Sequence, residues 1–257
     1  MSPEILTFPL GKATLMLLPI PPGKFKMGSP PDEVERLSNE DQVDVTISQP
    51  FWMAETQFTQ DQWEAVMGSN PSYFKGGNLP VEKVSWDDCV VCLVKLNQLL
   101  QDQLPTGYRF TLPTEAQWEY ACRAGTTTAF HYGNDLDSTM ANFDGNFPYG
   151  KGKKGKCLET TTPVKTYRPN AWGLYDMHGN IWEWCQDAWK MYLDSWDGIA
   201  KRQGGVDPGG TGGSGRVFRG GSWNGYGRWC RSALRGKVTL GSRGNDIGFR
   251  PALTVPR

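Results

Sequence analysis

Apolar and polar residues follow two different periods along this chain, and each period predicts a different kind of element. Alternation over residues 13–29, on either side of a Pro-Pro-Gly turn, and over residues 43–56 predicts short strands. Apolar residues at helical spacing, preceded by a serine or threonine that can cap a first turn, predict three helices. These helices are expected at residues 59–67, 85–103 and 114–123.

The C-terminal part of the chain predicts further strands at residues 216–223, 230–235 and 247–253, with polar turns between them. Residues 124–168 show little periodicity, and a long irregular stretch is usually held in place by something, for which a bound metal is one candidate. No internal repeat and no dividing linker is visible. We therefore expect a single domain over residues 1–257.

Composition adds that the fold is rich in loops. The 257 residues include 31 glycines, 18 prolines and 11 tryptophans, so many turns and a core filled by a few large side chains are expected. The 27 Lys and Arg residues balance the 27 Asp and Glu residues. Nothing electrostatic therefore favours a nucleic acid or an anionic membrane as partner.

The N-terminus carries no basic region, and the longest apolar stretch, residues 13–22, is interrupted by prolines and too short to span a bilayer. We therefore expect a cytoplasmic protein with reduced cysteines. Cys89 and Cys92 form a C-x-x-C pair within a predicted amphipathic helix. Because no second pair and no histidine pair lies nearby, core packing is favoured over a metal or redox site.

Six segments together resemble the formylglycine-generating-enzyme (sulfatase-modifying-factor) family, and they occur in the family's order over nearly the whole chain. They are Pro22-Gly-Lys-Phe-Lys-Met-Gly-Ser29, Leu79-Pro-Val-Glu-Lys-Val-Ser-Trp86, Leu112-Pro-Thr-Glu-Ala-Gln-Trp-Glu-Tyr120, Asn170-Ala-Trp-Gly-Leu-Tyr-Asp-Met-His-Gly-Asn-Ile-Trp-Glu-Trp184, Arg219-Gly-Gly-Ser-Trp223 and Gly248-Phe-Arg250. The resemblance implies an α+β, C-type-lectin-like fold. Such a fold is loop-rich, with a small twisted antiparallel sheet and two principal helices.

The resemblance also implies a calcium site. In the family a calcium ion is held by the side chains that match Asp176 and Glu183 and by the carbonyls that match Gly179 and Ile181. Two carboxylates and loop carbonyls are hard oxygen ligands of the kind calcium prefers. The alternative is that the two carboxylates only hydrogen-bond a tight turn. A second family site is not expected, because its acidic position falls near Lys156.

The copper chemistry of the family requires two cysteines, which lie three and eight residues after the serine of the Gly-Gly-Ser motif. Here these positions are Gly225 and Cys230. One thiolate alone is a poor Cu(I) site, so no copper is expected and the sequence predicts that the chain is not an enzyme. Only two histidines, His131 and His178, are present, too few for a three-histidine iron site. The alternative is a divergent copper-dependent formylglycine-generating oxidase that acts on a substrate cysteine through Cys230.

Residues 216–250 alternate motif residues with residues of no common chemistry, a pattern that resembles the variable proteins of diversity-generating retroelements. In these proteins an adenine-directed mutator rewrites asparagine codons on a lectin-like scaffold, although Trp229 is not reachable from such a codon. The resemblance predicts a non-catalytic ligand-binding protein whose partner is a protein or another macromolecule. The expected ligand-binding residues are Asn224, Gly225, Tyr226, Trp229, Leu234, Gly236, Val238, Thr239, Leu240, Ser242, Gly244, Asn245 and Asp246.

Two alternatives to this interpretation stay open. The apolar members of the set could point inward as ordinary core, with the polar members in turns. The whole domain could also be a regulatory or scaffolding module that works beside signalling proteins.

Overall fold

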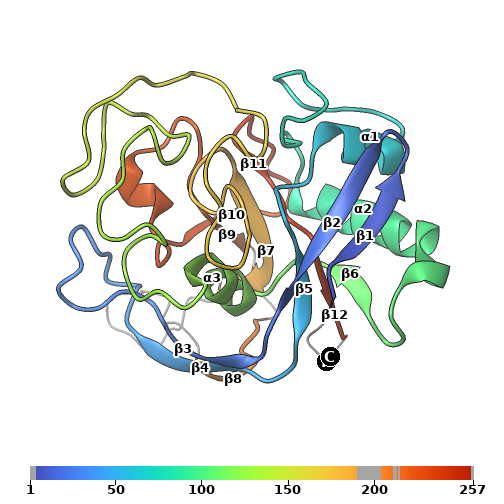
Figure 1. The fold of residues 1–257 in the computed structure, drawn as a ribbon, viewed down its shortest axis with the longest axis horizontal. Helices are drawn as coiled ribbons and strands as arrows, with labels where there is room; N and C mark the ends of the chain where they lie inside the picture. Colours follow the sequence, from blue (N-terminus) through green and yellow to red (C-terminus); the bar gives the residue numbers. More distant parts are fainter. Residues whose placement is uncertain (1–3, 190–203, 211–212, 214, 256–257) are drawn as a thin grey trace.

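The computed structural model describes residues 4–189, 204–210, 213 and 215–255 (Figure 1). Its largest sheet has five antiparallel strands in the order β1-β2-β5-β12-β6. The strands are β1 (Leu6–Leu10), β2 (Ala13–Ile20), β5 (Phe51–Ala54), β12 (Ala252–Thr254) and β6 (Arg109–Thr111). Because β12 lies between β5 and β6, the end of the chain completes a sheet that its beginning started.

Two smaller sheets carry the other strands of the described residues. One has the order β10-β9-β7-β11, and its short last strand runs parallel to β7. The other has the order β3-β4-β8. The strands are β10 (Gly236–Thr239), β9 (Gly215–Arg219), β7 (Trp182–Ala188), β11 (Ile247–Gly248), β3 (Gly23–Met27), β4 (Val43–Ile47) and β8 (Gly205–Val206).

The described residues contain three α-helices, and each starts where its sequence predicted. They are α1 (Gln60–Met67), α2 (Trp86–Leu99) and α3 (Glu115–Arg123). Thr59, Ser85 and Thr114 cap the three first turns, and each helix has a complete capping box. Helix α2 ends earlier than expected and is followed by a short 3-10 turn, η1 (Gln101–Gln103). No helix of the described part of the chain is both long and apolar enough to cross a membrane.

Large aromatic side chains fill the core, as the composition predicted. Trp118 and Trp184 are completely buried and belong to two adjoining clusters of apolar side chains. Cys89 and Cys92 are buried in the cluster beneath α2. Burial raises the pKa of the Cys92 thiol to about 12, so it stays protonated and packs as an apolar group. The prediction that this pair serves core packing is confirmed.

The predicted strand at residues 230–235 is wrong. This segment starts at the end of a 3-10 turn, η2 (Gly227–Cys230), and continues without regular structure. Its backbone is bonded to a distant loop and to a side chain instead of a neighbouring strand. The Ser232 N–H donates to the Ala129 carbonyl over 2.7 Å, and the Ser232 carbonyl accepts from the Arg219 guanidinium over 2.6 Å.

Candidate functional site

Four arginines anchor the C-terminal segment from inside the protein. Arg219 is completely buried, and its guanidinium donates to Glu115 over 2.8 Å and to Glu119 over 2.5 Å, both on α3. Arg235 donates to the same Glu115. These ion pairs fix the backbone on both sides of η2 against one helix.

The other two arginines pair with more distant parts of the chain. Arg231 donates to Glu33 and to both carboxylate oxygens of Glu40. Arg250 donates to both oxygens of Glu183 over 3.1 and 2.9 Å. A bidentate arginine–carboxylate pair fixes distance and plane together. The backbone of the segment is therefore held by charges that face inward.

Between these anchors, aromatic rings stack on the surface. The rings of Tyr226 and Trp229 lie parallel, with centroids 4.9 Å apart and an interplanar angle of 15°. Phe147, from the irregular part of the chain, continues the stack at 4.1 Å from Tyr226. The guanidinium of Arg228 lies 5.4 Å from the Tyr226 ring. Phe147 is 46% exposed and Trp229 is 36% exposed, so the stack presents an apolar face to solvent.

Phe147 was missed by sequence reasoning because it lies in residues 124–168, where no period indicates its orientation. Two backbone hydrogen bonds place this loop beside the C-terminal segment. Asp144 N–H donates to the Gly225 carbonyl, and Gly227 N–H donates to the Phe147 carbonyl. In the sequence, Phe147 was marked only as an apolar residue within a polar loop.

The polar part of the predicted set adjoins this stack. Asn224 is exposed, and its side chain accepts from Ser222 and interacts with Asp246. Trp223 donates from its indole to the Asn245 carbonyl over 3.1 Å, which joins the turn at 244–246 to the residues before η2. The surface formed by Phe147, Asn224, Tyr226, Arg228 and Trp229 is called the aromatic surface below.

The remaining predicted positions divide into three kinds. Leu234 is only 5% exposed and packs in the core, so its expected exposure is wrong: the paired arginines on either side turn it inward. Gly225 is also buried. The others lie apart from the stack, on β10 or in the turn after it, and are exposed or half-buried. They are Gly236, Val238, Thr239, Leu240, Ser242 and Gly244.

The four residues predicted to bind calcium are brought together, but their carbonyls already have a partner. The side-chain amide nitrogen of Gln57 lies 3.3 Å from the Asp176 and Gly179 carbonyl oxygens and 3.1 Å from that of Ile181. Only glycine fits at position 179, because a Cβ there would lie 2.3 Å from the Asn142 carbonyl oxygen. The amide N–H groups of Gln57 thus take the position at which the carbonyls converge.

The orientation of the Gln57 amide is fixed by a directional network. Asn180 accepts from the Thr162 backbone N–H and donates to the Thr162 carbonyl, which determines which end of its own amide is the donor. That donor reaches the oxygen of Gln57 over 3.1 Å. Gln57 must therefore present its nitrogen, a donor and not a ligand, to the three carbonyls.

Of the two carboxylates, Glu183 is engaged, whereas one oxygen of Asp176 is buried without a hydrogen-bond partner. Glu183 is bound by Arg250 and by the Trp118 indole. One oxygen of Asp176 accepts from Lys165 N–H, and burial raises the pKa of this carboxyl to about 6. With Gln57 in place this set does not fit a calcium ion, because an N–H donor occupies the point where the cation would sit.

Of the two positions that match the family's copper ligands, one carries a thiol. Gly225 carries no thiol, and Cys230 is completely buried, with its sulfur 3.9 Å from the Tyr226 carbonyl oxygen. Burial raises the pKa of the Cys230 thiol, which disfavours the thiolate that copper requires. No group of three or more His, Cys, Asp or Glu side chains within the described ranges is arranged to hold a metal ion.

His178 serves as a buried hydrogen-bonding residue. Its Nδ1 lies 2.6 Å from the Cys230 carbonyl oxygen and must donate to it. The opposite nitrogen accepts from the His131 backbone N–H over 3.2 Å. Burial holds the pKa of His178 well below its usual value, so the ring is neutral and joins three loops.

Comparison with known sequences identifies relatives over most of the chain. The family model of the sulfatase-modifying factor enzyme 1-like domain matches residues 7–255. The formylglycine-generating enzyme of Mus musculus is 32% identical over 212 residues, which is 79% of this chain and 51% of the mouse protein. That of Thermomonospora curvata is 34% identical and covers 79% of this chain and 64% of that protein. The chain therefore spans only about half to two thirds of these relatives.

Among solved structures, Treponema denticola variable protein 1 is 28% identical and superposes with a TM-score of 0.79. The match covers 99% of this chain and 100% of that protein. The predicted α+β, C-type-lectin-like fold is thereby confirmed, including its likeness to a variable protein.

The expectation that the chain is not an enzyme is overturned by these relatives. Three of them, 32–34% identical over 79% of the chain, are named as formylglycine-generating enzymes. That expectation gave one missing cysteine more weight than the resemblance of the whole domain. The chain belongs to the sulfatase-modifying factor enzyme 1-like domain family.

Proposed function

We propose that this protein binds a macromolecular ligand, most simply another protein, through the aromatic surface, in the manner of a retroelement variable protein. The observation that carries the proposal is the stack of Phe147, Tyr226 and Trp229 on a segment held from beneath by buried ion pairs. Aromatic rings on a rigid support give a large contact area at small entropic cost, as in antibody binding sites. The likeness to a variable protein over its full length supports the same function.

The division of labour within the segment further supports this proposal. Side chains that turn inward, such as Arg219 and Arg231, each bind two carboxylates, so substitution there would disrupt the fold. Side chains that turn outward, such as Asn224 and Trp229, can be exchanged without such a loss. A diversified protein requires this separation.

The experiment that tests the proposal is the sequencing of the DNA that adjoins the gene. We expect a near-copy of its 3′ end, together with a reverse transcriptase gene. Differences between copy and gene should fall at adenines in codons of outward-facing residues such as Asn224 and Tyr226. A neighbourhood without such a copy, or a copy that differs at the codons of Arg219 or Arg231, would contradict the proposal.

A second candidate is oxidation of a substrate cysteine, which the names of the relatives favour. The described residues provide one of the two thiols that copper needs, so we derive no chemical step through the metal. The test is incubation of the protein with copper, oxygen and a cysteine-containing peptide, followed by detection of a peptide aldehyde. Turnover that is lost in Cys230→Ser would support this candidate, and absence of aldehyde would reject it.

A further inference from the structure

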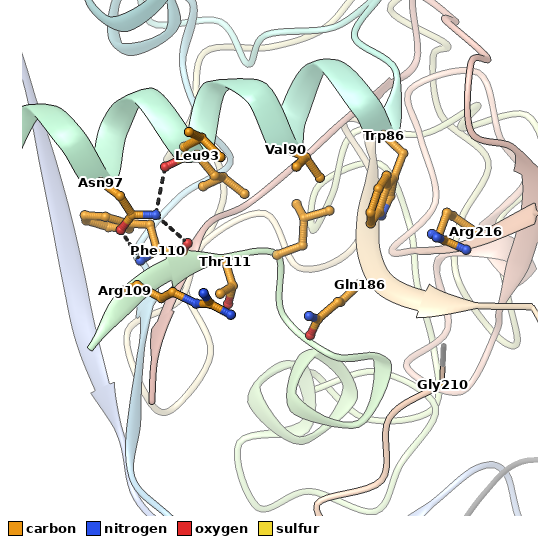
Figure 2. Close-up of a pocket in the computed structure, with 12 residues that line it drawn as sticks. Trp86, Val90, Leu93, Asn97, Arg109, Phe110, Thr111, Gln186, Gly210 and Arg216 are labelled. Atoms are coloured by element: carbon orange, nitrogen blue, oxygen red, sulfur yellow. Dashed lines mark hydrogen bonds between the residues drawn. The ribbon is translucent and has the colours of Figure 1, made fainter. Parts of the chain in front are cut away.

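A pocket lined by two arginines without a carboxylate partner among the described residues lies between α2, β6 and the start of β9 (Figure 2), and none of its lining residues belongs to the aromatic surface. Its volume is about 350 Å³, which lies in the range of small-molecule sites. Figure 2 shows Trp86, Val90 and Leu93 of α2 on one side and Arg109 with Gln186 on the other. The pocket therefore combines an apolar wall with cationic and amide side chains.

Arg216 lies against the apolar wall. Its guanidinium lies over the Trp86 ring, 4.4 Å from the centroid, and the Trp86 indole is fixed by a hydrogen bond of 2.9 Å to the Cys185 carbonyl. The Nε atom of Arg216 is buried without a hydrogen-bond partner. Its one hydrogen bond to the described residues is long, 3.5 Å from a terminal nitrogen to the Gly213 carbonyl. A partly desolvated guanidinium with unused donors favours an anion.

Most other arginines of the segment pair with carboxylates, and Arg228 stacks on the Tyr226 and Trp229 rings instead. Arg219, Arg231, Arg235 and Arg250 are buried with carboxylates, and even the exposed Arg243 pairs with Asp88. Neither Arg109 nor Arg216 has a carboxylate partner in the parts of the chain described above, and no acidic residue lines the pocket. A carboxylate on a ligand would supply the partner that the buried Nε of Arg216 lacks.

The polar side chains of the pocket separate into fixed and free groups. Asn97 is fully engaged: its amide donates to the Leu93 and Phe110 carbonyls and accepts from the Phe110 N–H. Gln186 is exposed and directed into the pocket. Asn97 therefore shapes the wall, whereas Arg216, Arg109 and Gln186 remain to bind a ligand.

We propose that this pocket binds a small organic acid, with its apolar body against Val90, Leu93 and Trp86 and its carboxylate on Arg216. Arg109, exposed at the rim, attracts the anion and makes the smaller contribution. This site does not depend on the aromatic surface. The protein would then have two separate binding sites, the aromatic surface for a macromolecule and this pocket for a small molecule.

The test is titration calorimetry of the full chain with 4-phenylbutyrate and with its neutral amide, 4-phenylbutyramide. The two probes share an apolar body and differ in charge. We expect saturable binding of the acid and about ten-fold or more weaker binding of the amide, the loss expected when a charged hydrogen bond is removed. No saturable binding of the acid, or equal binding of both probes, would overturn the proposal without any variant.

Substitutions then assign the site. Arg216→Met keeps an apolar stem over Trp86 but removes the charge, and it should weaken the acid about ten-fold while leaving the amide unchanged. Arg109→Gln should weaken the acid only slightly. Arg228→Met, which removes a similar guanidinium from the aromatic surface, is the matched control and should change neither affinity. Unchanged binding of the acid to Arg216→Met would overturn the assignment.

Discussion

The inner and outer faces of the C-terminal segment differ in what holds them. On the inner face, Arg219 and Arg231 reach across the molecule to carboxylates on α3 and in the loop before β4. On the outer face, the rings of Tyr226 and Trp229 stack on one another, with Phe147 and the Arg228 guanidinium beside them. The same short segment thus contains residues that determine the fold and residues that the fold leaves free.

Charge, and not hydrophobicity, marks the structural residues of this segment. The usual expectation is that arginines are exposed and aromatic rings are buried. In this segment the arginines are buried instead, because each inward-facing arginine pairs with two buried carboxylates or with both oxygens of one. The apolar stack consequently remains on the surface, where it can serve binding.

The largest expected effect is the loss of an inward arginine. Arg219→Met leaves Glu115 and Glu119 buried without their shared partner, which should lower the free energy of unfolding by about 3–5 kcal/mol. Urea denaturation followed by tryptophan fluorescence measures this loss. The matched control is Arg243→Gln, because the Arg243–Asp88 pair is exposed and should contribute less than about 1 kcal/mol. Equal losses in both variants would remove the contrast between the two faces.

A buried carboxylate without an arginine should make stability depend on pH. Glu82 is completely buried, one of its oxygens has no partner, and burial raises its pKa to about 7. The folded protein thus retains a proton that the unfolded chain has already released, so stability falls as pH rises from about 4.5 to 7. Glu82→Gln should remove roughly 1–3 kcal/mol of that fall, measured by urea denaturation at several pH values. An unchanged pH profile would show that Glu82 is ionised in the folded protein.

The effect of calcium on stability should depend on whether position 57 carries an amide or a carboxylate. In the wild-type protein the Gln57 side-chain N–H groups donate to the converging carbonyls. The melting temperature should therefore be the same in calcium and in chelator. Gln57→Glu replaces those donors by a ligand, and calcium should stabilise this variant by about 1–2 kcal/mol. The exposed substitution Gln186→Glu is the control and should not respond. Stabilisation of the wild-type protein by calcium would mean that Gln57 leaves the carbonyls.

The smallest effect on stability is expected on the outer face. Tyr226→Ala and Trp229→Ala should each lower the free energy of unfolding by less than about 1 kcal/mol, because the rings contact mainly one another. Urea denaturation of the two single variants tests this prediction. A loss of several kcal/mol would place these rings among the structural residues.

The sequence correctly predicted the features that depend on local chemistry or on the motifs of the family. Thr59, Ser85 and Thr114 indicated the three helix starts because a cap acts within one turn. It did not predict the burial of side chains that depends on contacts with residues far away in the sequence. Leu234 is buried because its neighbour Arg235 binds Glu115, which lies 120 residues away.

The candidate sites show the same limit. The four residues of the calcium motif do lie together, but nothing near them in sequence indicated that Gln57 would fill their centre. Phe147 joins the aromatic surface through backbone contacts between loops, which carry no periodic signal. Arg216 could be recognised only from its place in the pocket and from its buried Nε, which has no hydrogen-bond partner.

The central claim is that the fold tolerates exchange on the outer face and not on the inner face. Two libraries test it most directly, one randomised at residues 224, 226 and 229 and the other at residues 219, 231 and 250. Both are displayed on yeast, and resistance to protease reports folding. We predict that most members of the first library resist protease like the wild type and that few members of the second do. Equal survival of the two libraries would contradict the account.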